Sequence, residues 1–252
     1  MQTSHDWIIY FRQNLQEKRI DWTIEPNITA KERAAIVRSM QAWQLGETSD
    51  GANLLVASKK YADKIGDELY CEAVKFFIKE EQKHGNNLGR YLDLIQEKRL
   101  SKDWGDSLFR KIRHFNTSMQ WWTLAVITVE SAAQVYYQAL KDATGCTLLK
   151  QICTDILIDE AYHIDFQMQR LSIIFCGKPV TQRIFAYQFY RLFYFSTSMV
   201  VWMGHRKLFK AGNVNFWRYC KKMNLKFRKT IDRMYNNQHL VKNQKEILSI
   251  NH

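Results

Sequence analysis

Two copies of a Glu-x-x-His motif are the residues of this sequence best suited to chemistry. They are Glu81–His84 and Glu160–His163. Residues three apart lie on one face of a helix, so each motif can direct a carboxylate and an imidazole at the same point. Carboxylate and imidazole ligands suit iron and manganese. The two motifs therefore predict a site for redox-active metal ions between two helices.

A pair of metal ions in a helical bundle needs one further Glu from each of two other helices. Glu130 is the clearest candidate, because it is the only acidic residue in the segment 107–141 and its surroundings are apolar. A carboxylate there must be neutralised by a proton or by a cation. Glu47 is the second candidate, in a polar segment that contains glycine, and Glu32 and Asp50 compete with it.

Both motifs lie within apolar stripes at helical spacing, where unpaired charge would be costly. The stripe residues are Val74, Phe77, Ile78, Leu88, Tyr91, Leu92 and Ile95 around the first motif, and Cys153, Leu157, Ile164 and Leu171 around the second. A lone motif of this kind is more often a solvated Glu beside a hydrogen-bonded His. The pair in this apolar setting favours metal binding.

The same periodicity predicts an all-α protein with a single domain over residues 1–252. Two Pro and ten Gly leave few interruptions, and we find no strand-like alternation. The expected core covers about residues 30–175, and a basic helical extension covers about 180–240. The predicted helices lie at about 3–19, 29–65 with a break near 46–51, 67–98, 106–143, 147–175, 180–211 and 213–238.

Positive charge is concentrated near the C-terminus. Residues 205–252 carry twelve Lys/Arg against two Asp/Glu, which is +10 of the net +12. This is either a solvated face or a surface for an acidic partner: a carrier protein, a nucleic acid such as RNA, or a membrane surface. The preceding segment 184–204 is rich in aromatics. Because it contains Gln188 and Arg191, we expect a packed core helix or a homodimer helix rather than a membrane span.

The five cysteines form no Cys-x-x-Cys pair, and their number is odd. This pattern favours a reducing cytoplasm over a disulfide scaffold. It also disfavours a four-thiolate iron site within the chain, so we expect an external electron donor. The apolar run at 7–11 is too short for a signal peptide, which agrees with a cytoplasmic location.

These motifs resemble the ferritin-like di-iron carboxylate superfamily over roughly residues 30–175. The segment 80–92, which begins Glu-Glu-Gln-Lys-His-Gly, resembles the second-helix motif of acyl-carrier-protein desaturases. The segment 158–164 resembles the fourth-helix Asp-Glu-x-x-His motif of those desaturases and of di-iron N-oxygenases. The N-oxygenases have an additional His one turn before that Glu, where this chain has Ile156.

The resemblance implies a ferritin-like four-helix bundle with additional N-terminal and C-terminal helices. It implies two iron ions, with manganese as an alternative at one or both sites, and a supporting role for Asp159 beside a metal-bound His. The ligands that it implies are Glu47, Glu81, His84, Glu130, Glu160 and His163.

The expected function is that of an O2-dependent di-iron oxidoreductase that desaturates, hydroxylates or N-oxygenates an organic substrate. The alternative is a ferritin-like iron-binding or ferroxidase protein without an organic substrate. A protein that only mediates interactions, with a degenerate site, is disfavoured by the complete ligand set. The resemblance to desaturases makes an acyl or peptidyl carrier protein the expected partner of the basic C-terminal extension.

Overall fold

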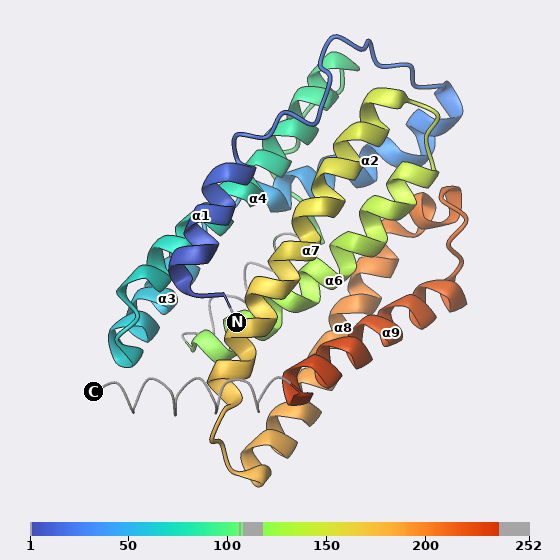
Figure 1. Cartoon of the computed structure of the whole chain (residues 1–252). Helices are drawn as coiled ribbons and strands as arrows, with labels where there is room; N and C mark the ends of the chain where they lie inside the picture. Colours follow the sequence, from blue (N-terminus) through green and yellow to red (C-terminus); the bar gives the residue numbers. More distant parts are fainter. Residues whose placement is uncertain (1, 106, 108–117, 237–252) are drawn as a thin grey trace.

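The computed structural model describes residues 2–105, 107 and 118–236, and over these residues it is helical without a β-strand (Figure 1). The prediction of an all-α protein is confirmed. The helices are α1 (Ser4–Asn14), α2 (Ala30–Glu47), α3 (Ala52–Ile65), α4 (Glu68–Leu94), α6 (Met119–Asp142), α7 (Thr147–Phe175), α8 (Val180–Ala211) and α9 (Phe216–Asn236).

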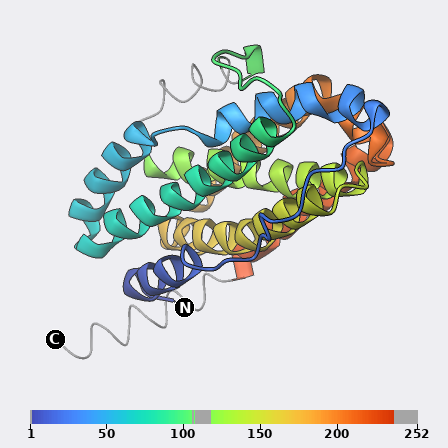
Figure 2. The same ribbon diagram turned by 90° about the horizontal axis from the view of Figure 1, so that it is seen from above.

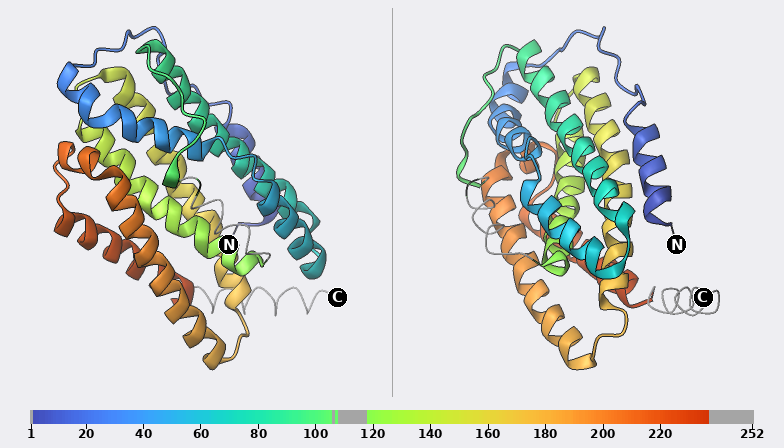
Figure 3. Two further views of the ribbon diagram at one scale, coloured as in Figure 1. Left: turned by 180° about the vertical axis from the view of Figure 1, so that it is seen from behind. Right: turned by 90° about the vertical axis from the view of Figure 1, so that its left-hand side faces the viewer.

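Four of these helices, α2, α4, α6 and α7, form the central bundle (Figures 1 and 2). Helix α7 packs along α6 and also against α4, and α4 packs against α2. Helices α1 and α3 both pack on α4, whereas α8 and α9 pack together on the other side of the bundle (Figure 3). Helices α2 and α6 meet through side chains, because Trp43 stacks on Tyr136 at a ring-centroid distance of 4.0 Å, and α8 packs against both helices. Beside this contact, residues of α2 and α6 line a cavity.

The predicted break between residues 46 and 51 separates α2 from α3. Helix α2 starts at a capping box in which the Thr29 hydroxyl accepts from the Glu32 amide and the Glu32 carboxylate accepts from the Thr29 amide. It ends at Glu47. Gly51 then takes a left-handed conformation (φ 64°), and a Cβ there would lie 2.5 Å from the Ile78 side chain. Glycine is therefore required for this turn.

Three helix boundaries differ from the sequence-based expectation. Helix α4 ends at Leu94 instead of near residue 98. Helix α1 ends at Asn14 instead of near residue 19, because Arg19 turns inward to pair with Asp155 and Asp159. Helix α6 begins at Met119 instead of near residue 106. Residues 106 and 108–117 of that predicted helix, and 237–238 of the last one, lie outside the described residues.

Helix α8 contains the aromatic segment 184–204, and one face of this helix packs against the core. Tyr190, Tyr194 and Trp202 are buried in the main core, whereas Phe185 and Leu192 are exposed. This agrees with the expectation of a packed helix. Among the described residues, no helix has both the length and the apolar character needed to cross a membrane.

Candidate metal centre

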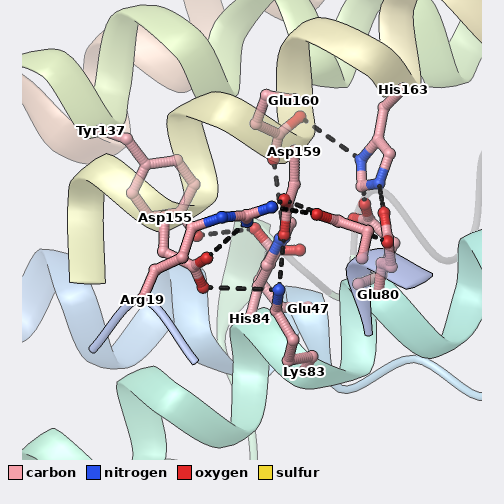
Figure 4. Close-up of polar contacts among 12 residues, drawn as sticks. Arg19, Glu47, Glu80, Lys83, His84, Tyr137, Asp155, Asp159, Glu160 and His163 are labelled. Atoms are coloured by element: carbon pink, nitrogen blue, oxygen red, sulfur yellow. Dashed lines mark hydrogen bonds and ion pairs between the residues drawn. The ribbon is translucent and has the colours of Figure 1, made fainter. Parts of the chain in front are cut away.

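The structure brings all six predicted ligand residues together between the helices of the bundle. Figure 4 labels four of them, Glu47, His84, Glu160 and His163. Each of the four bundle helices supplies at least one of the six residues. These six form two overlapping groups, and within each group one ligand atom per residue lies within 4.8 Å of the others. The first group is Glu47, Glu81, His84 and Glu160, and the second is Glu81, Glu130, Glu160 and His163. The two carboxylates common to both groups are placed to bridge two metal ions.

Five of the six residues are buried and Glu81 is partly exposed, and several of their atoms lack hydrogen-bond partners. His84, Glu160 and His163 are fully buried, and Glu130 is 2% exposed. The unpartnered atoms are Nδ1 of His84, Nδ1 of His163, Oε1 of Glu81 and both carboxylate oxygens of Glu160. A buried polar atom without a partner is costly. Because these atoms converge on the same region, they fit a pair of cations.

Each imidazole is held by a carboxylate from the opposite motif helix. His84 Nε2 on α4 lies 3.0 Å from Asp159 Oδ2 on α7, and His163 Nε2 on α7 lies 2.8 Å from Glu80 Oε2 on α4. With Nε2 donating to a carboxylate, the Nδ1 lone pair of each ring is free for a metal ion. We call Glu80 and Asp159 the outer carboxylates.

The contact of 2.8 Å between His163 Nδ1 and Glu81 Oε1 has a different character. Neither atom has a partner in hydrogen-bonding geometry. These two atoms therefore approach each other as two ligands of one metal ion would, facing a common centre rather than bonding to each other.

Asn14 at the end of α1 joins the two outer carboxylates. Its Nδ2 donates to Glu80 Oε1 at 2.6 Å and to Asp159 Oδ1 at 2.8 Å. Asp159 also accepts from Arg19 Nη1 at 2.9 Å and from Lys83 Nζ at 2.8 Å. Because Asn14 links Glu80 to Asp159, the supports of both imidazoles form one network.

The pKa values of Glu47, Glu130 and Glu160 are shifted in the opposite direction from that of Asp159. Burial, followed by the nearby charge of Glu81, raises the pKa of Glu47 to about 8. Burial also raises the pKa of Glu130, and burial together with repulsion from Glu130 raises the pKa of Glu160. At Asp159 burial acts in the same sense, but the hydrogen bond and charge of His84 and the charge of Lys83 outweigh it and hold its pKa well below the usual range. Glu47, Glu130 and Glu160 would therefore be stabilised by added positive charge, whereas Asp159 already has positive charge beside it.

Two aromatic side chains fix the orientation of Glu47. The Tyr137 hydroxyl donates to Oε1 at 2.7 Å, and the Trp43 indole Nε1 donates to the same oxygen at 2.8 Å. Gly85 on α4 allows this close approach, because a Cβ there would lie 3.2 Å from the Glu47 backbone and 2.9 Å from Thr48. With Oε1 held in this way, Oε2 remains for a metal ion.

Glu32 and Asp50, the alternative candidates to Glu47, form hydrogen bonds elsewhere in the structure. Glu32 caps α2 and also accepts a hydrogen bond from the Gly145 backbone amide. Asp50 accepts from the Ala52 amide at the start of α3. Neither belongs to a group of potential metal ligands among the described residues.

A cavity of about 590 Å³ reaches the cluster between α2 and α6. Three of the candidate ligands, Glu47, Glu81 and Glu130, line it. Its other walls are mainly apolar and include Trp43, Phe77, Ile78, Trp122, Ala125, Val126, Val129, Val200 and Val201. The cavity lies directly beside Glu47 and Glu130. The site can therefore admit an organic molecule as well as dioxygen.

Sequence reasoning missed much of the support around the cluster. Glu80 had a usable signal, because it precedes Glu81 as Asp159 precedes Glu160. Asn14, Trp43 and the Tyr137 hydroxyl had none, since their roles depend on how the helices pack.

No family model matches the chain, and no curated protein matches it. Solved structures do resemble it, among them several of R2-like ligand-binding oxidases. A point variant reconstituted aerobically with an Fe/Fe cofactor has a TM-score of 0.64 at 15% identity, and the match covers 92% of this chain and 93% of the other. The form without metal cofactor has a TM-score of 0.60 at 15% identity, covering 94% and 96% of the two chains.

A second point variant, reconstituted aerobically with an Mn/Fe cofactor, has a TM-score of 0.58 at 13% identity, covering 94% of this chain and 93% of that one. At this level of identity the likeness concerns the fold. The chain has the ferritin-like helical fold of these dimetal proteins, as the sequence motifs predicted.

Proposed function

We propose that this chain is an O2-dependent oxidoreductase with a pair of metal ions, two irons or one manganese and one iron, that oxidises an organic substrate. One observation carries the proposal: a cluster of six potential ligands, five of them buried and several with unpartnered atoms, opens into a mainly apolar cavity. The similar solved structures, whose names describe oxidases with Fe/Fe or Mn/Fe cofactors, support it.

The charges of the proposed ligand set match two divalent cations. Four carboxylates and two neutral imidazoles would be neutralised by two such ions, which removes the cost of burying like charges together. Glu81 and Glu160, which belong to both groups of potential ligands, would contact both ions, and His84 and His163 would each hold one of them. Glu47 and Glu130 complete the two coordination spheres from the helices that border the cavity.

A reduced pair of iron ions, when bound, supplies electrons for the reduction of dioxygen. The protein controls the access of water and the orientation of the ligands. The apolar side chains of the cavity exclude water from the faces of Glu47 and Glu130. Trp43 and Tyr137 keep Glu47 in a single orientation. The outer carboxylates keep both imidazoles in the tautomer that has a free Nδ1.

The electrons come from another protein in this proposal. Among the described residues no cysteine belongs to a group of potential metal ligands, and all five are free thiols. Desaturation, hydroxylation and N-oxygenation all remain within the proposal. The cavity favours an organic substrate over iron storage, because storage requires no apolar chamber beside the ligands.

Metal content and oxygen consumption test the proposal together. Anaerobic loading with ferrous iron should give about two metal ions per chain. Exposure to dioxygen should then consume oxygen and, with acyl or amine candidates present, give oxidised products detectable by mass spectrometry. His84→Ala, His163→Ala and Glu130→Ala should each lower the metal content.

The control variant is Glu32→Gln, which retains the capping box of α2 and should retain both metal ions. Full metal content in Glu130→Ala would remove Glu130 from the ligand set. Uptake of many irons per chain into a large shell, without oxidation of any organic compound, would instead establish the storage alternative.

A further inference from the structure

His205 is a histidine in the cavity wall that does not belong to the metal cluster. It lies on α8 and lines the same cavity as Glu47, Glu81 and Glu130. Its Nδ1 lies 2.7 Å from the Ser39 hydroxyl oxygen on α2. Within the part of the chain that the structure describes, Nε2 has no hydrogen-bond partner. Nε2 is therefore the ring nitrogen left to meet a molecule in the cavity.

The imidazole ring is held in place by its neighbours. Trp43 and Tyr136 lie at ring-centroid distances of 5.2 and 5.3 Å, both in edge-on orientation. Together with the hydrogen bond to Ser39 they restrict rotation of the ring. A polar group held in this way is organised before a ligand arrives, which reduces the entropy lost on binding.

The ring is neutral at physiological pH. Burial lowers the pKa of His205 to about 4, and Asp103 opposes this only partly. The other charged residues of the cavity wall have contacts of their own: Arg38 pairs with Asp103 at 3.0 Å, and Asp50 accepts a hydrogen bond from the Ala52 amide. Apart from the candidate ligands, the cavity thus presents a neutral imidazole in a mainly apolar wall.

The position of Trp43 relates this imidazole to the metal centre. Its indole ring packs against His205, and its Nε1 donates to Glu47. A molecule with a polar group at His205 would therefore extend past the Trp43 ring toward the ligands. Ala125, Val126 and Val129 on α6 supply an apolar wall that ends at Glu130.

We propose that His205 Nε2 binds the uncharged polar group of a mainly apolar substrate, such as a hydroxyl, carbonyl or amide, and so orients the remainder of that molecule toward the metal centre. The orienting role rests on the proposed function, whereas the binding role does not. A neutral imidazole in an apolar wall offers no compensation for a charged head group, so ionised substrates are disfavoured.

Four matched probes test this selectivity: para-butylphenol, butylbenzene, para-butylbenzoate and para-butylbenzylammonium. Their affinities should be measured by calorimetry with metal-free and with iron-loaded, anaerobic protein. The neutral phenol should bind most tightly. His205→Phe should weaken phenol binding by about threefold to tenfold, the usual effect of one hydrogen bond, and leave butylbenzene binding nearly unchanged.

Two conservative variants distinguish a hydrogen bond from a packing effect. His205→Gln places an amide nitrogen near the position of Nε2 and should retain most of the preference for the phenol. His205→Asn places it near Nδ1 and should lose the preference. His5→Phe, at an exposed position of α1, is the control and should change neither affinity.

Equal loss of phenol and butylbenzene in His205→Phe would overturn the inference, as would tightest binding of a charged probe or binding of none of the four. Metal content and oxygen consumption of the same samples separate this inference from the proposed function. A His205-dependent preference in protein that consumes no oxygen refutes the proposed function alone. Oxygen consumption without that preference refutes the inference alone.

Discussion

His84 on α4 is hydrogen-bonded to Asp159, the residue that directly precedes the candidate ligand Glu160 on α7. The reverse relationship holds between His163 on α7 and Glu80, which directly precedes Glu81 on α4. Each motif thus supplies two potential ligands of its own and the support for the imidazole of the other motif. Because Asn14 donates to both Glu80 and Asp159, the two halves of the site are linked by hydrogen bonds.

The outer carboxylates should control metal affinity. Asp159→Asn and Glu80→Gln remove a negative charge behind one imidazole each, so each should weaken metal binding by roughly 10- to 100-fold. Anaerobic titration with Mn²⁺ or Fe²⁺ measures this effect. Asp155→Asn is the matched control, since Asp155 pairs with Arg19 and Lys83 without contacting either imidazole, and a smaller effect is expected. Equal effects of all three variants would show that only the overall charge matters.

The metal-free protein should lose stability as the pH rises. The pKa of Glu47 is raised to about 8 by burial and by Glu81, and the pKa values of Glu130 and Glu160 are raised as well. Between the usual pKa of a carboxyl group and these raised values, the folded chain binds more protons than the unfolded chain. The free energy of unfolding should therefore fall by roughly 1.4 kcal/mol per pH unit for each such group.

The imidazoles change stability in the same direction. The pKa of His84 is raised because the hydrogen bond to Asp159 and nearby carboxylates outweigh its burial, so its contribution is lost as the pH rises through that raised value. Metal-loaded protein should show little of this slope. Urea unfolding at about pH 5.5 and about pH 8 measures both forms. In metal-free protein, Glu47→Gln should reduce the slope, and an unchanged slope would show that Glu47 does not titrate in this range.

Gly85 should be needed for the position of Glu47. A Cβ at Gly85 would press on the Glu47 backbone and Thr48, so Gly85→Ala should cost about 1–3 kcal/mol in unfolding free energy and weaken metal binding. Gly89→Ala on the same helix is the control. A Cβ there meets the guanidinium of Arg99, a half-exposed side chain that can move, so the substitution should be neutral or stabilising. Equal effects on metal binding would contradict a specific role for Gly85.

The sequence was sufficient to predict which helices carry the cluster, because the spacing within each motif is a local property of one helix. Glu81 and His84 lie on one face whatever the helix packs against. The break between α2 and α3 was likewise predictable, since it depends on glycine. Glu130 could also be predicted as a candidate ligand without knowledge of the fold. It is the one carboxylate of an apolar segment, and a buried lone carboxylate requires a neutralising partner.

The rest depends on contacts between helices. Whether Asp159 supports His84 or the His163 of its own helix cannot be read from spacing, and the structure places it with His84. The end of α1 is similar: residues 15–19 have no helix breaker, but Arg19 finds buried carboxylates only if the helix stops early. Tertiary pairing therefore overrides local helix preference at that point.

The exposed basic face of α9 should bind an acidic protein, and we propose an acyl or peptidyl carrier protein. Lys221, Lys222, Arg228 and Lys229 are exposed on this helix. Lys226 differs, because it is half-buried and donates to Gln134, and burial lowers its pKa to about 8. Charge reversal of the four exposed residues should slow association with an acidic acyl carrier protein and leave metal content unchanged.

The matched control reverses four exposed lysines elsewhere, Lys59, Lys60, Lys75 and Lys79, for the same change in net charge. Association should also weaken as salt rises past about 0.1 M, where exposed charges are screened beyond about 10 Å. If both sets of reversals slow association equally, the effect comes from net charge and α9 is not a docking surface. If RNA binds through α9 and carrier protein does not, the acidic partner is a nucleic acid and the proposed carrier protein is wrong.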